Sequence, residues 1–124
     1  MNEPGNASNS NAVVEAENAL NTLASDIGAA LSVATASLST TSIYSEIAEI
    51  NHQINAIAND AKRGILHLNR TIKISEEIAH FNGELISRKS INPLIPDNLI
   101  SLLNLAVAHA EKALLLVRAA LQAS

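Results

Sequence analysis

The sequence predicts an all-α protein: an elongated antiparallel helical bundle of three long helices, or of four if the middle helix breaks at Gly64. Two observations predict this class. The apolar residues make up 48% of the chain and are mostly Ala, Ile and Leu, with Tyr44 and Phe81 as the only aromatics. Along most of the chain these apolar residues recur every three or four positions, which is the spacing of one helix face.

The chain predicts one folded domain behind a polar tail. Its 124 residues fall in the usual size range of a single domain. Residues 1–11 are rich in Asn, Ser, Gly and Pro and have no apolar anchor, so we expect them to form a disordered tail. We expect residues 12–124 to form the helical bundle.

The first helix is expected over residues 12–38. Ser10 or Asn11 can cap its N-terminus, because a short polar side chain accepts a hydrogen bond from a free backbone N–H. Its apolar positions follow a heptad pattern and are rich in Ala, which allows neighbouring backbones to approach closely. The members of this stripe are Val13, Ala16, Leu20, Leu23, Ile27, Ala30, Leu31, Ala34 and Leu38.

A second helix begins after the polar stretch at residues 39–42, where Thr41 or Ser42 can provide the cap. The turn is short, so this helix is expected to return antiparallel to the first. Its apolar residues alternate steps of four and three, as in a coiled coil. They are Ile43, Ile47, Ile50, Ile54, Ile57 and Ala61.

The sequence around Gly64 allows two interpretations. A glycine followed by Ile65 is typical of a helix C-terminus. However, Ile65, Leu68, Ile72 and Ala79 continue at helical spacing, and no proline or turn cluster separates the two halves. We therefore favour one long helix that bends at Gly64, with Asn82-Gly83 as a stop and a short extension to Arg88. The alternative is two helices that meet at Gly64.

A loop is expected from Ser90 to Asn98, because it contains Pro93 and Pro96. Three apolar residues in this loop are expected to pack across the end of the bundle: Ile91, Leu94 and Ile95. Asp97 is a suitable N-cap for the last helix, which we expect to run to about Gln122.

The last helix predicts a non-enzymatic interaction or assembly function. It is apolar around most of its circumference, more than one groove of a small bundle can cover. We expect it to mediate self-association or docking to a helical protein partner. The residues expected to form this interface are Leu102, Leu105, Leu115 and Leu116.

Composition argues against several other functions. The net charge of −4 disfavours nucleic-acid binding, and the absence of Cys excludes disulfides and thiol chemistry. No phosphate-binding glycine loop is present, and we expect neither a cofactor nor enzymatic activity. No uninterrupted apolar stretch is long enough to predict a membrane span, and the start of the chain does not resemble a Sec signal peptide. We therefore expect a cytoplasmic protein or one exported by a non-Sec route.

Histidines suggest an alternative function. The sequence contains two Glu-x-x-His motifs, which ferritin-like four-helix bundles use to bind two metal ions. The residues of this alternative site are Glu49, His52, Glu77 and His80. The expected register places them beside the apolar stripe, so we favour a solvated polar face over a metal site. His67 and His109 have no acidic partner on their own helix face, and we expect them to be surface or interface residues.

Overall fold

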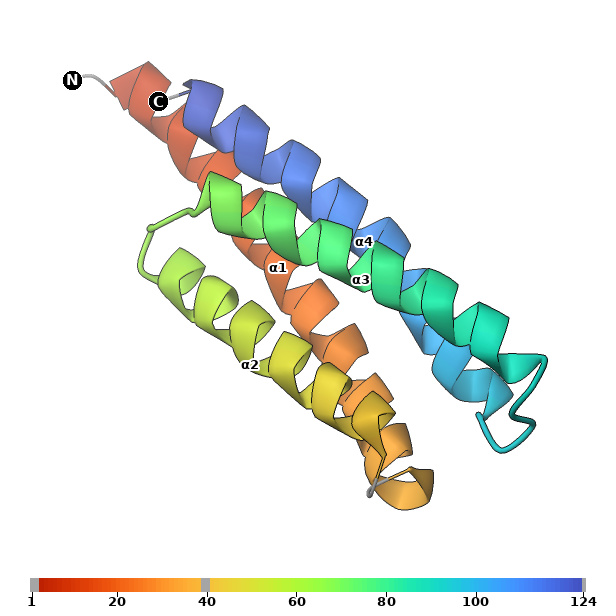
Figure 1. Cartoon of the computed structure of the whole chain (residues 1–124). Helices are drawn as coiled ribbons and strands as arrows, with labels where there is room; N and C mark the ends of the chain where they lie inside the picture. Colours follow the sequence, from red (N-terminus) through yellow and green to blue (C-terminus); the bar gives the residue numbers. More distant parts are fainter. Residues whose placement is uncertain (1–2, 39–40, 124) are drawn as a thin grey trace.

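The structure is a bundle of four helices. The computed structural model describes the backbone of residues 3–38 and 41–123 and the side chains of residues 11–38 and 41–122. In chain order, the helices are α1 (Glu3–Ser37), α2 (Ser42–Lys62), α3 (Leu68–Lys89) and α4 (Asp97–Ala123). They run alternately up and down the long axis of the molecule (Figure 1). The described residues contain no strand, so the all-α prediction is confirmed.

The predicted helix boundaries hold at most junctions. Thr41 is the N-cap of α2 as predicted, and its side chain accepts a hydrogen bond from the backbone N–H of Tyr44 at 3.3 Å. α4 begins at Asp97, one residue before the start expected with Asp97 as its N-cap. α1 begins at Glu3, before the expected start at Ala12. The division into a tail of residues 1–11 and a bundle of residues 12–124 stays a prediction.

The preference for three long helices was wrong, because the chain breaks at Gly64. Gly64 has a φ of +82°, a left-handed conformation that cannot continue a right-handed helix. Its N–H donates to the carbonyl oxygen of Ala61 at 2.9 Å, and the N–H of Ile65 donates to that of Asp60 at 3.0 Å. This pair of bonds is the Schellman arrangement that closes many helices. It satisfies two carbonyl groups at the end of α2.

The predicted core of α1 and α2 is confirmed. Every member of the isoleucine seam of α2 is buried. Of the α1 stripe, Val13 and Leu31 are partly buried, and the other seven members are fully packed in the core. The heptad pattern predicted these faces well because each helix keeps one register from end to end.

The predicted face of α3 was wrong. We expected Ile65, Leu68, Ile72 and Ala79 to continue the seam of α2. However, Ile65 and Ala79 are exposed, and Leu68 and Ile72 are only partly buried. The break at Gly64 resets the helical phase, so α3 presents a different stripe to the core. The buried residues of α3 are Thr71, Ile74, Ile78, Phe81, Asn82 and Leu85.

The helices pack unequally. α1 packs most extensively against α4, while α2 and α3 share by far the smallest helix–helix interface. Small residues explain the close packing of α1 and α4, because side chains without bulk allow two backbones to approach. The buried alanines on these two helices are Ala16, Ala30, Ala34, Ala106, Ala110, Ala113 and Ala120. The weak α2–α3 interface leaves a groove along that side of the bundle.

The loop between α3 and α4 differs from its expected packing. Ile95 is fully buried, as predicted. Ile91 and Leu94, however, are 85% and 77% exposed, so they do not cover the end of the bundle. The hydrophobic pattern of the loop could not separate these positions, because a loop has no regular side-chain period.

Candidate functional site

The interface predicted on α4 divides into two pairs of leucines. Leu102 and Leu116 are partly buried and pack against the core. Leu105 and Leu115 are 48% and 65% exposed. This division follows from the position of the core face of α4, because Leu105 and Leu115 lie on a different side of the helix from the residues that face the core. The residues that form the core face are Leu99, Leu103, Ala106, Ala110, Ala113, Val117 and Ala120.

Leu105 and Leu115 belong to one exposed strip, which we call the α4 outer face. At about 100° per residue, they lie within about 80° of each other around the helix axis. The strip also contains two small residues and one cation, all of them exposed. The α4 outer face is formed by Leu105, Ala108, Lys112, Leu115 and Ala119.

α4 also corrects the expectation that the chain contains no segment able to span a membrane. The stretch Asp97–Gln122 covers 26 residues and is long and apolar enough to cross a membrane. The expectation required an uninterrupted apolar run, whereas a few charges are tolerated in a spanning helix when its mean hydropathy is high. The test considers only length and hydropathy, and the core helix of a soluble protein can also pass it. In α4, the apolar residues of the core face contribute to the high hydropathy.

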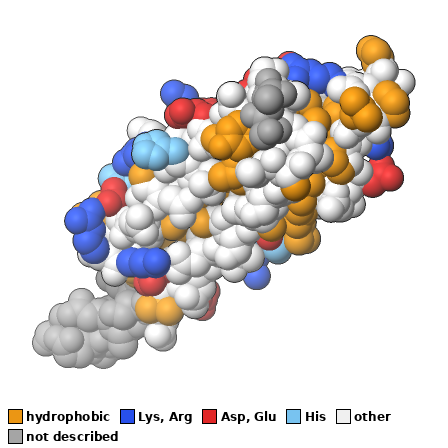
Figure 2. All heavy atoms as spheres, turned by 90° about the horizontal axis from the view of Figure 1, so that it is seen from below, with side chains coloured by type: hydrophobic (Ala, Val, Ile, Leu, Met, Phe, Trp, Pro, Cys, Tyr) orange, Lys and Arg blue, Asp and Glu red, His pale blue; other side chains and the backbone are white. Residues whose placement is uncertain are grey.

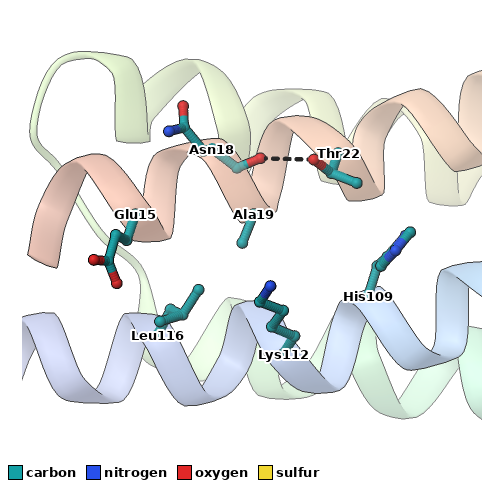
Figure 3. Close-up of a pocket in the computed structure, with 7 residues that line it drawn as sticks. All are labelled: Glu15, Asn18, Ala19, Thr22, His109, Lys112 and Leu116. Carbon is teal, nitrogen blue, oxygen red and sulfur yellow. Dashed lines mark hydrogen bonds between the residues drawn. The ribbon is translucent and has the colours of Figure 1, made fainter.

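A polar groove lies between α1 and α4 (Figure 3). Its volume is about 330 Å³. Figure 3 shows side chains of both helices directed toward it, with Lys112 reaching from α4 toward α1. The residues that line the groove are Glu15, Asn18, Ala19, Thr22, His109, Lys112 and Leu116.

A buried carboxylate holds His109 at one end of this groove. The Nδ1 atom of His109 is hydrogen-bonded to the carboxylate of Asp26, which is only 9% exposed. The partner of His109 is not on its own helix face but comes from α1. The sequence held one signal for it. Asp26 precedes Ile27 on the core side of α1, and a buried carboxylate needs a hydrogen-bonding partner.

The α1–α4 groove offers no activated nucleophile. The Thr22 hydroxyl donates to the backbone oxygen of Asn18 at 3.0 Å, an ordinary bond within a helix. The Asp26–His109 pair joins the two helices that pack most closely. Its geometry is explained by this structural role.

The α2–α3 groove brings together three of the four residues of the alternative metal site. Glu49, Glu77 and His80 line a cavity of about 200 Å³, and His52 does not. His80 lies beside Glu84, with 3.6 Å between its Nε2 and the Glu84 carboxylate. Among the residues that the structure describes, no group of three or more His, Asp or Glu side chains is arranged to hold a metal ion. The ferritin-like arrangement is not formed.

A second histidine–carboxylate pair closes the turn between α2 and α3. Asp60 accepts a hydrogen bond from Arg63 and lies 2.6 Å from the Nε2 atom of His67. The hydrogen bonds from His67 and Arg63 lower the pKa of Asp60. The partner of His67 is likewise not on its own helix, because Asp60 lies in α2 on the other side of the break at Gly64.

The comparisons with known proteins identify no relative. No protein-family model matches this chain, and no match was found among the curated proteins or the solved structures.

Proposed function

We propose that this chain is a non-enzymatic assembly module that pairs with a second copy of itself through the α4 outer face. The observation that carries the proposal is the exposure of Leu105 and Leu115 on a helix whose opposite side is already buried in the core. Large exposed apolar residues that share one helix face are typical of an association surface.

The pattern on this face favours an antiparallel pairing of two α4 helices. If the two-fold axis crosses the helix pair at the level of residue 110, midway between the two leucines, Leu105 of each copy lies opposite Leu115 of the other. The small side chain of Ala108 lies between them and allows the helices to approach. Lys112 lies near the centre of this strip, and the oppositely charged Glu111 is its neighbour in the sequence, outside the strip.

The expected interface is small. It would cover only Leu105 and Leu115 of each copy, which are 48% and 65% exposed in the single chain, and association itself costs several kcal/mol. We therefore expect a dissociation constant of about 10 µM or weaker. Such a dimer is detectable only when the protein is concentrated well above this value.

Light scattering coupled to size-exclusion chromatography tests the proposal. The wild-type chain is expected to approach the mass of a dimer as its concentration rises. The double variant Leu105→Lys/Leu115→Lys is expected to remain a monomer with unchanged helicity. Ile86→Lys is a matched control, because Ile86 is also 48% exposed but lies on α3. A wild-type monomer at all concentrations, or a double variant that still dimerises, would contradict the proposal.

The length and hydropathy of α4 support a second candidate, insertion of this helix into a membrane. Insertion would require α4 to leave α1 and α3, because its core face is buried against them. Extraction of membranes with alkaline carbonate separates the two candidates. An inserted chain stays in the membrane pellet, whereas a folded dimer is released into the supernatant.

A further inference from the structure

We propose that the α3–α4 end of the bundle docks on a phospholipid bilayer by inserting Ile91 and Leu94. Of the large hydrophobic residues whose side chains are described, these two are the most exposed, at 85% and 77%. They lie three positions apart on the same loop, at one end of the bundle (Figure 1). Apolar side chains also gather at the end of the molecule away from the N-terminal residues (Figure 2).

The loop is fixed in a conformation that points these side chains outward. The N–H groups of Ile91 and Asn92 donate to the carbonyl oxygen of Arg88 at 3.0 and 2.8 Å. The N–H of Leu94 donates to the side-chain oxygen of Asn92 at 3.1 Å. Pro93 restricts the backbone further. The exposure of Ile91 and Leu94 is therefore part of an ordered structure.

The second half of the loop is anchored to the bundle. Ile95 is fully buried, and its carbonyl oxygen accepts a hydrogen bond from the Lys89 ammonium at 2.5 Å. Lys89 also forms an ion pair with Asp97 at 2.9 Å. Because the loop is held on both sides, inserting Ile91 and Leu94 into a bilayer costs little additional ordering.

The charge distribution suits a lipid surface at this end. The chain has no charged residue over residues 27–45 or over residues 98–108. The described parts of these segments, residues 27–38, 41–45 and 98–108, lie toward the α3–α4 end of the bundle (Figure 1). Lys89 is neutralised by Asp97, which leaves Arg88 as the cation nearest to the loop. A cation beside exposed apolar side chains can contact lipid phosphates while the apolar groups enter the interface.

The shape of the loop favours a bilayer over a folded protein partner. Ile91 and Leu94 are exposed on a loop at one end of an elongated bundle, away from the grooves between the helices. None of the cavities described between the helices includes a loop residue. The loop is therefore suited to insertion into a soft surface.

Sedimentation with sucrose-loaded vesicles tests this inference. The wild-type chain is expected to bind vesicles made of equal parts phosphatidylcholine and phosphatidylglycerol. Ile91→Asp/Leu94→Asp is expected to lower the partition coefficient at least about tenfold, because two apolar anchors become charged. Circular dichroism is expected to show unchanged helicity, since both side chains face solvent. Arg88→Gln is expected to weaken binding to these anionic vesicles more than binding to pure phosphatidylcholine, which carries no net charge.

Leu105→Lys/Leu115→Lys separates this inference from the proposed function. This variant is expected to remain monomeric. Its partition coefficient onto vesicles is expected to equal that of the wild-type monomer. Absence of vesicle binding by the wild-type chain would overturn the inference. Equal binding by Ile91→Asp/Leu94→Asp would also overturn it, because binding would then come from charge alone or from insertion of α4.

Discussion

The break at Gly64 predicts that a single methyl group destabilises the protein. A Cβ added at Gly64 would meet nothing within 4 Å, so Gly64→Ala changes no packing. The cost is conformational, because the φ of +82° places Cβ too close to the following carbonyl group. This cost is about 1–2 kcal/mol, and the lower entropy of the unfolded chain offsets part of it. We expect a net loss of about 1 kcal/mol in the free energy of unfolding.

Gly83→Ala is a matched control with the opposite expected sign. Gly83 lies inside α3, and a Cβ there would also meet nothing within 4 Å. Alanine in a helix interior is more stable than glycine by about 0.5–1 kcal/mol. Urea denaturation followed by circular dichroism measures both variants. If Gly64→Ala stabilised the protein as Gly83→Ala does, residue 64 would be helical and the four-helix description would be wrong.

Three further predictions concern polar side chains. Because the pKa of Asp60 is lowered in the folded protein, its ionised carboxylate stabilises the protein above about pH 3.8, and this stability is lost as the pH falls through the lower folded pKa. Urea titrations should therefore show that the difference in unfolding free energy between wild type and Asp60→Asn shrinks as the pH falls below 3.8. Asn82→Leu is expected to raise the free energy of unfolding, measured in urea, by about 1 kcal/mol, because the buried Oδ1 of Asn82 has no hydrogen-bond partner. The side chain of Asn104, which accepts from the Asn82 amide, is exposed and can be hydrated instead. A loss of stability would contradict this prediction. A double-mutant cycle of Asp26→Asn and His109→Gln is expected to give a coupling energy of about 1 kcal/mol, and independent effects of the two substitutions would show that the pair does not join α1 to α4.

Helices whose apolar spacing and caps depend only on nearby residues could be predicted from the sequence. The isoleucine seam of α2 and the cap at Thr41 depend only on local spacing and local hydrogen bonds, so both could be recognised without a structure. The face of α3 could not be recognised, because its phase depends on whether Gly64 bends or breaks the helix. Residues such as Ile72 fitted the wrong phase equally well.

The candidate sites were harder to predict than the helices. The apolar excess of α4 was visible, but only the packing of α1 and α3 determines that Leu115 is exposed while Leu116 packs against the core. Pairs such as Asp26 and His109 are separated by 83 positions, and helical periodicity does not describe contacts between helices. The exposure of Ile91 arises from loop hydrogen bonds, which have no sequence period.

Oxidative cross-linking tests the proposed pairing of α4 most directly. The chain has no Cys, so Leu105→Cys and Leu115→Cys each introduce a single thiol. In the antiparallel pairing, two copies of either variant place their thiols about 15 Å apart along the helix axis, which is too far for a disulfide. An equal mixture of the two variants places the thiols opposite each other.

We expect a cross-linked dimer from the mixture and little from either variant alone. The product should contain one chain of each variant, which mass spectrometry can identify. Cross-linking of Leu105→Cys with itself would indicate a parallel pairing and contradict the arrangement. No cross-linking in any combination, at concentrations well above about 10 µM, would contradict association through the α4 outer face.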